Sequence, residues 1–255
     1  MLDVVDLVEQ IKGRGFSICP ALIDAYEVTN YVRHLEPLLE MQQRGDLPNT
    51  DKGLIHSPML LDPIFLNLLD NQTLKRITDV SLGESAIMYA FSSSSIAPHD
   101  DNYAGRIHVD CPRVIPNYIT NLGVIVALSD FSQENGGTLF LPSSFEMETP
   151  PSAEQFRSGA VTIQMRAGDA AFFNTRTWHM SGRNMTTTAR HSLTLNFCRS
   201  YMRQRFDYPR MIPSDVLETL TEQQRQYLGF FVQMPTSWEE FAAPAELRKY
   251  RPGQG

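Results

Sequence analysis

The chain has 255 residues, of which 42% are hydrophobic and 20% charged, so disordered and collagen-like proteins are excluded and one domain with a sizeable core is predicted. The formal net charge is -7 and no basic run offsets it, which excludes nucleic acid as an expected partner.

Cysteine usage and the N-terminal residues predict the compartment. Cys19, Cys111 and Cys198 lie far apart and are odd in number, which favours a reducing environment over a disulfide framework. The first residues include acidic side chains instead of a basic segment followed by an apolar one, and no apolar run reaches the roughly 18 residues that cross a bilayer. We expect a cytoplasmic protein with no membrane partner.

The first third of the chain, about residues 1–84, is predicted to be helical. In chain order we expect a helix at 4–11, a strand at Phe16–Cys19, a helix at 28–35, and shorter helical stretches near 64–69 and 73–80, each long helix from apolar residues at helical spacing. The first helix should stop at the pair Gly13 and Gly15, and Pro37 should kink or end the second.

From about residue 85 to 200 the pattern changes to short apolar runs separated by turn residues, which is typical of an antiparallel sandwich or barrel. The strands are expected near 86–91, 106–110, 123–128, 138–141, 160–164, 170–174 and 192–199. The remaining residues, about 201–255, should form a helical cover that begins with a helix capped by Ser214 and continuing to Tyr227. A barrel of this kind suits a buried site for a small molecule.

The strongest chemical signal is the pair His108 and Asp110. In a strand, residues two apart point to the same face, so these side chains could grip one ion together. His179 follows the predicted strand at 170–174, where a barrel could bring it opposite the pair. Two imidazoles and one carboxylate form the facial triad typical of non-haem iron(II) sites.

A histidine two residues before an aspartate is a weak motif by itself, because a lone histidine is more often a hydrogen-bonded structural residue. His99 and Asp101 repeat the motif in a Ser-rich polar stretch, where a solvated loop is the better interpretation. What strengthens the first pair is Arg190 at the entrance to the last predicted strand. A guanidinium matches a carboxylate, so Arg190 could hold the far end of a diacid that chelates the metal.

These motifs together resemble the phytanoyl-CoA dioxygenase family of iron(II)/2-oxoglutarate-dependent oxygenases. The matching segments run in the family's order over about residues 10 to 200: Gly15-Phe16, His108-Val109-Asp110, Asn135-Gly136-Gly137-Thr138-Leu139-Phe140-Leu141-Pro142-Ser143, Gly168-Asp169, His179-Met180-Ser181-Gly182-Arg183-Asn184 and Arg190. The resemblance implies a double-stranded β-helix, a jelly-roll or cupin-like core that is mainly β with flanking helices.

The resemblance also implies roles for residues. The ligands of Fe(II) would be His108, Asp110 and His179, and Arg190 would bind the distal carboxylate of the cosubstrate 2-oxoglutarate, with O₂ as second substrate. Thr138 and Ser181 would add hydrogen bonds to 2-oxoglutarate. The enzyme would decarboxylate 2-oxoglutarate to succinate and CO₂ while it oxidises, most simply hydroxylates, a small organic metabolite. Desaturation and ring formation stay open, whereas halogenating relatives typically replace the carboxylate at the position of Asp110.

One segment departs from the family pattern and leaves the substrate open. Where relatives commonly read Pro-Gly-Ser-His, this chain reads Pro142-Ser143-Ser144-Phe145. The expected substrate contacts lie on this segment or flank the metal ligands, and they are Tyr103, Arg106, Arg113, Asn117, Tyr118, Phe145 and Trp178. Each has a plainer interpretation as packing or surface, as do His34, His56 and His191, and the Gly136-Gly137 pair could simply form a tight turn.

Two other hypotheses compete with the oxygenase. A cupin-like metal-dependent isomerase or epimerase, or a small-ligand-binding module, would share the barrel without using 2-oxoglutarate, because fold alone does not choose a function. A non-catalytic scaffold would make the histidine, aspartate and arginine set a coincidence. A role in natural product biosynthesis is the preferred expectation, and the sequence leaves monomer and homodimer equally open.

Overall fold

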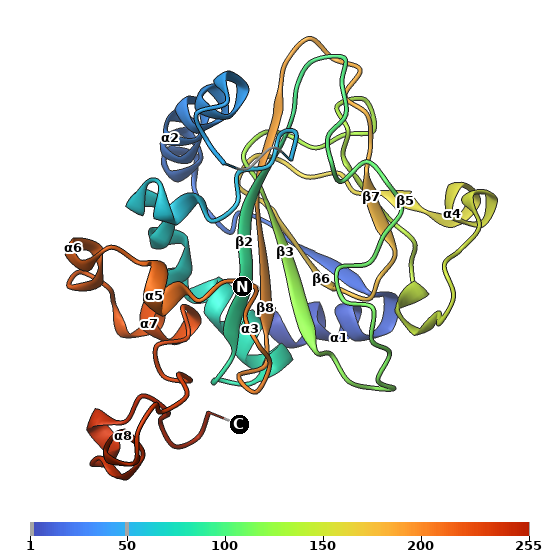
Figure 1. Ribbon diagram of the computed structural model, residues 1–255. Coiled ribbons are helices and arrows are strands. Elements are labelled where there is room, and N and C mark those ends of the chain that lie inside the picture. Colours follow the sequence, from blue (N-terminus) through green and yellow to red (C-terminus); the bar gives the residue numbers. More distant parts are fainter. Residues whose placement is uncertain (1–2, 49–50, 255) are drawn as a thin grey trace.

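The computed structural model describes residues 3–48 and 51–254, and its centre is a pair of antiparallel sheets (Figure 1). The five-stranded sheet has the order β1 (Phe16–Cys19), β6 (Ala170–Asn174), β3 (Asn121–Ala127), β8 (Arg190–Cys198), β2 (Ile87–Ile96). The three-stranded sheet has the order β5 (Val161–Thr162), β4 (Thr138–Phe140), β7 (His179–Ser181). The predicted strands at 16–19 and 170–174 are confirmed with the same bounds.

Helices flank these sheets, so the predicted combination of antiparallel strands and helices is present. The α-helices are α1 (Val4–Arg14), α2 (Ala25–Arg44), α3 (Gln72–Leu82), α4 (Ala153–Gly159), α5 (Tyr208–Met211), α6 (Ser214–Leu217), α7 (Glu222–Tyr227) and α8 (Trp238–Ala242). The 3₁₀ segments are η1 (Pro58–Leu60), η2 (Pro63–Asp70), η3 (Ser144–Glu146) and η4 (Ala245–Leu247). Helical residues outnumber strand residues, 34% against 20%, so "mainly β" was wrong for the chain as a whole.

Local sequence explains how the long helices begin and end. The Asp3 carboxylate accepts the first free amides of α1, and Gly15 ends that helix in the left-handed conformation, as its position predicted. Asp24 and Glu27 cap α2 reciprocally, which satisfies two of the amides that a helix start leaves free.

The larger sheet is buried on both faces, because its strands alternate between two hydrophobic clusters. Val124 and Val126 of β3 join the cluster that contains α1, α2 and α3, whereas Ile125 and Ala127 join the cluster between the two sheets. This alternation leaves every residue of β3 buried. In Figure 1 most helices, among them α2, α3 and α7, lie on one side of the larger sheet, whereas β7, β5 and the short helix α4 lie on the other side.

Three predicted elements were wrong. Helix α2 continues past Pro37 to Arg44, because its other hydrogen bonds and its buried face tolerate the loss of one donor. The C-terminal helix is broken: Ser214 lies inside the short helix α6 after Pro213, and Thr221 begins a separate helix, α7. The expected strand at 106–110 is reduced to one isolated bridge, at His108.

Within residues 3–48 and 51–254, no helix combines the length and the apolar character that a membrane crossing requires.

Candidate active site

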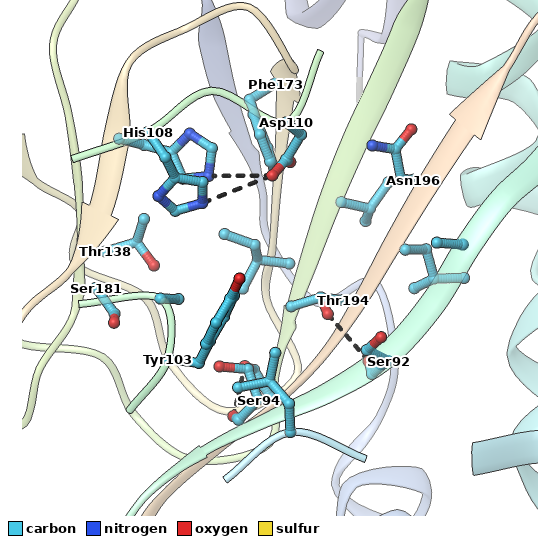
Figure 2. A pocket seen from close by; sticks show the side chains of 18 of the residues that line it. Ser92, Ser94, Tyr103, His108, Asp110, Thr138, Phe173, Ser181, Thr194 and Asn196 are labelled. Carbon is cyan, nitrogen blue, oxygen red and sulfur yellow. Dashed lines mark hydrogen bonds and ion pairs between the residues drawn. The ribbon is translucent and has the colours of Figure 1, made fainter. Parts of the chain in front are cut away.

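His108, Asp110 and His179 lie together although two of them come from a loop. His108 and His179 form an antiparallel bridge in which each backbone amide donates to the other residue's carbonyl at 2.9 Å. The Asp110 amide donates to the Thr175 carbonyl at 3.0 Å, which ties the loop to the segment between β6 and β7. Backbone pairing therefore brings the three residues together, and Figure 2 shows the side chains of His108 and Asp110 at one corner of the cavity.

The geometry of the three side chains suits a single metal ion. Oδ1 of Asp110 lies 3.6 Å from Nε2 of His108 and 3.9 Å from Nε2 of His179, and one ligand atom from each residue lies within 4.8 Å of the others. Among the residues that the structure describes, these three side chains form a group that could hold a metal ion. Its donor set of two imidazoles and one carboxylate fits iron(II) with open positions for further ligands.

Hydrogen bonds orient both imidazoles toward the shared point. Nδ1 of His108 lies 2.7 Å from the Arg106 carbonyl, and Nδ1 of His179 lies 2.9 Å from the Thr177 carbonyl. A carbonyl only accepts, so each Nδ1 carries the proton and each Nε2 keeps its lone pair for a metal. Burial lowers the pKa of His179 to about 4, with a smaller opposite influence from Asp110, so its imidazole is neutral at pH 7.

A cavity of about 500 Å³ opens beside these three residues and reaches Arg190. Arg190 is only 2% exposed, and its guanidinium donates to Oγ of Ser192 at 3.1 Å and lies 4.4 Å above the Phe131 ring. Its Nε has no partner, and no carboxylate pairs with it among the described residues. Burial lowers its pKa to about 9, so it remains cationic at neutral pH. A buried cation without a counter-charge is costly, and an anionic ligand would offset that cost.

Thr138 and Ser181 line the same cavity from neighbouring strands. They are partners in the register between β4 and β7, and Oγ of Ser181 donates to Oδ1 of Asn102 at 3.0 Å. Figure 2 shows both side chains on the side of the cavity that also holds His108. Both residues thus line the cavity that the candidate metal ligands and Arg190 also line.

Tyr103 and Arg106 line the cavity near its mouth, as expected for substrate contacts. Tyr103 is 49% exposed and the Arg106 guanidinium lies 4.3 Å above its ring. The two side chains therefore form a stacked pair at the entrance, where they could meet a substrate.

The structure does not bring the other five expected substrate residues to this cavity. Asn117, Tyr118 and Phe145 line a second cavity of about 310 Å³, and Arg113 and Trp178 line neither cavity. The amides of Asp110 and Cys111 both point to the Thr175 carbonyl, so the loop turns away after Asp110. Trp178 precedes His179 and points to the opposite face, where it is buried.

Several cavity residues were missed by the sequence analysis. Ser192, Thr194 and Asn196 lie two apart after Arg190 and share its face of β8, so alternation along the strand could have found them. Ser92 and Ser94 face them from β2. In Figure 2, Ser92, Thr194 and Asn196 form the wall across the cavity from His108.

His56 also lines the cavity, although its sequence context indicated an ordinary loop residue. Its Nδ1 lies 2.9 Å from Oγ of Ser92 and its Nε2 lies 2.9 Å from a carboxylate oxygen of Asp51. An isolated bridge between His56 and Ser92 places it there. No local pattern encodes such a contact between distant segments.

Of the remaining histidines, His34 and His191 have structural partners and His99 lies in an exposed loop, as the plainer interpretation expected. His34 pairs with Asp62 at 2.6 Å, Nδ1 of His191 lies 2.8 Å from Oγ of Ser95, and His99 lies in an exposed turn. The second histidine–aspartate motif is thus a loop, in which Asp100 pairs with Lys52 at 2.6 Å.

Two residues with positive φ flank strand β4, one before it and one after it. Gly136 has φ +83°, and a Cβ there would lie 2.8 Å from the Gly182 carbonyl oxygen, so the turn requires glycine. Ser143 has φ +58°, a left-handed conformation that glycine adopts more readily. Its amide and hydroxyl bond the carbonyls of Arg14 and Gly13, which offsets the strain.

Comparison with known proteins agrees with the geometry. The phytanoyl-CoA dioxygenase (PhyH) family model matches residues 15–192, and the chain belongs to this family. A relative, the uncharacterized protein Rv1501 of Mycobacterium tuberculosis, is 30% identical over 208 residues, which cover 80% of this chain and 76% of that protein.

Solved structures resemble the fold at low sequence identity. EctD from S. alaskensis, crystallised with bound Fe, has a TM-score of 0.67 at 16% identity. The match covers 80% of this chain and 79% of the EctD chain. HygX from Streptomyces hygroscopicus, crystallised with nickel and 2-oxoglutarate, has a TM-score of 0.62 at 15% identity, with coverage of 80% and 89%.

Proposed function

We propose that the protein is an iron(II)- and 2-oxoglutarate-dependent dioxygenase that hydroxylates a small organic metabolite. The observation that carries this proposal is one cavity that holds both a set of metal donors suited to facial coordination and a buried guanidinium that, among the described residues, has no carboxylate partner. A metal site alone would fit many cupin-like enzymes. A diacid cosubstrate would engage both the metal and the buried guanidinium.

Each residue would then have a defined task. His108, Asp110 and His179 would hold Fe(II), which when bound supplies the activation of O₂ that the side chains cannot supply. Arg190 would pair with the distal carboxylate of 2-oxoglutarate, and Thr138 and Ser181 would offer hydroxyl groups along its length.

The walls would keep water from the reacting groups and orient the substrate. Phe173 and Ile125 give the cavity apolar surface beside the metal donors, and Thr194 and Asn196 give it polar groups on the opposite wall. Tyr103 and Arg106 would contact the substrate at the mouth. Exclusion of water matters here because it protects a reactive oxidant from side reactions.

The two sheets support a double-stranded β-helix core within a single domain. They face each other across an apolar cluster that includes Phe16, Phe140 and Phe173, with helical segments before and after the core. PhyH membership and iron- or nickel-bound structures of the same fold support this assignment.

Anaerobic spectroscopy tests the proposal. Fe(II) and 2-oxoglutarate together should give a weak visible charge-transfer band, and the Arg190→Gln variant should need far more 2-oxoglutarate to show it. Succinate formation coupled to a hydroxylated product would then identify the substrate among candidate metabolites. Full activity with zinc, or turnover without loss of 2-oxoglutarate, would contradict the proposal and favour a metal-dependent isomerase.

A further inference from the structure

The second cavity, of about 310 Å³, lies next to the candidate active site. Asn174 lines it at the end of β6, and the preceding residue, Phe173, lines the first cavity. Its other walls come from residues 114–119, the end of α3 and the segment that follows β6. The side chains that matter most here are Arg176, Arg199 and Ser81, and none of them lines the first cavity.

Arg176 is a buried cation without a counter-charge. It is 6% exposed, one terminal nitrogen donates to the Met147 carbonyl, and its buried Nε has no partner. No carboxylate forms an ion pair with it in the described part of the chain. Burial lowers its pKa, which reflects the cost of keeping the charge away from water.

A second orphaned polar group lines the same cavity from another element. Ser81, in the last turn of α3, is 7% exposed, and its buried hydroxyl has no hydrogen-bond partner in the part of the chain that the structure describes. Buried polar atoms in folded proteins normally have a hydrogen-bond partner, so the Arg176 Nε and the Ser81 hydroxyl are both available to a ligand in this cavity.

Positively charged side chains outnumber negatively charged ones around the second cavity. Arg199 also lines it: its guanidinium donates to the carbonyls of Ile119 and Leu82 at 3.1 and 2.9 Å and lies 4.1 Å above the Tyr118 ring. Lys12 at the rim pairs with Glu9. The one carboxylate in the wall, Glu146, is exposed and pairs with neither arginine.

We propose that the second cavity binds a small oxyanion, a carboxylate or a phosphate, through Arg176, Arg199 and Ser81. A water molecule could satisfy the serine hydroxyl, but it would leave the buried Arg176 charge uncompensated. An oxyanion supplies both negative charge and acceptor oxygens that match the planar guanidinium groups. This site does not depend on the proposed oxygenase activity, because it shares no lining residue with the first cavity.

Calorimetric titration of the full-length chain, without added metal, tests the site with inorganic phosphate and malonate as separate probes. The variants are Arg176→Gln, Arg190→Gln in the first cavity, and Arg113→Gln, an exposed arginine that lines neither cavity. We expect at least one probe to bind the wild-type and Arg113→Gln proteins alike, to keep a binding event in Arg190→Gln, and to lose at least tenfold in affinity for that event in Arg176→Gln. The probe that binds tells whether a carboxylate or a phosphate is preferred.

Several results would overturn the proposal. Binding that survives in Arg176→Gln would mean an adventitious ion only, and binding lost in Arg190→Gln would place the anion in the first cavity. Absence of binding for both probes up to tens of millimolar would remove the site.

Two further experiments test the site even if Arg176→Gln does not fold. Ser81→Ala should weaken binding severalfold without loss of charge. A crystal of the wild-type protein grown with the binding probe should show it between Arg176 and Ser81. Density elsewhere, and none there, would count against the site.

Discussion

Arg190 and Arg176 are both buried arginines with an unpartnered Nε, yet they face different surroundings. Arg190 shares its cavity with two imidazoles and a carboxylate arranged around one point, whereas the cavity of Arg176 has no such group among the described residues. The buried charge predicts an anion in both places. Only the metal donors distinguish a cavity in which chemistry can follow from one in which binding is all that the side chains support.

The largest expected effect is the loss of a metal donor, which would remove the difference between the two cavities. His179→Ala is expected to abolish stoichiometric iron binding and to reduce succinate formation at least about 100-fold, since even residues that only support metal ligands are worth 10–100-fold. Metal analysis and product assays measure both effects. His99→Asn, in the exposed second motif, is the matched control and should keep its iron; equal iron content in both variants would mean that His179 is no ligand.

The next largest effect should separate the two arginines by ligand. At about 100 times its dissociation constant, 2-oxoglutarate should stabilise the iron-loaded wild-type protein by about 2.7 kcal/mol. Arg190→Gln should lose most of this stabilisation, because a charge-assisted contact in a buried site is worth about 2–4 kcal/mol, and Arg176→Gln should keep it. Thermal unfolding with and without 2-oxoglutarate measures this, and equal losses in both variants would erase the distinction between the cavities.

A smaller effect concerns the turn that supports the first cavity. Gly136→Ala should lower the free energy of unfolding by about 1–3 kcal/mol, because Gly136 has a positive φ and a Cβ would meet a backbone oxygen. Gly13 in α1 is the control: its Cβ would meet nothing within 4 Å, so Gly13→Ala should be neutral or stabilising by up to about 1 kcal/mol. Chemical denaturation compares them, and a stabilising Gly136→Ala would show that the turn is not strained.

The smallest expected effect tests whether Tyr118 belongs to the second cavity and not to the substrate site. Its hydroxyl lies 2.7 Å from that of Tyr201, and both side chains are substantially exposed. Tyr118→Phe should therefore cost less than about 1 kcal/mol in unfolding free energy. It should also leave 2-oxoglutarate turnover unchanged, since Tyr118 lines the second cavity. A marked loss of turnover in steady-state assays would return Tyr118 to the substrate site.

The sequence by itself determined the features that are encoded locally. The spacing of apolar residues and the stop at Gly13 and Gly15 predicted α1, and the apolar runs predicted strands such as β6. The ordered set of motifs predicted the family and named three residues that the fold then brought within reach of one ion. These signals are legible because each depends on neighbours in the chain or on a fixed order of short segments.

The tertiary structure alone decided the features that depend on contacts between distant segments. A backbone bridge between His108 and His179, and not the predicted strand, brings His108 and Asp110 close to His179. The loop that continues after Asp110 carries Asn117 and Tyr118 to the second cavity. His56 reaches the first cavity only by its bridge to Ser92. Likewise, whether a buried arginine has a partner depends on every element packed around it, which no periodicity in the sequence records.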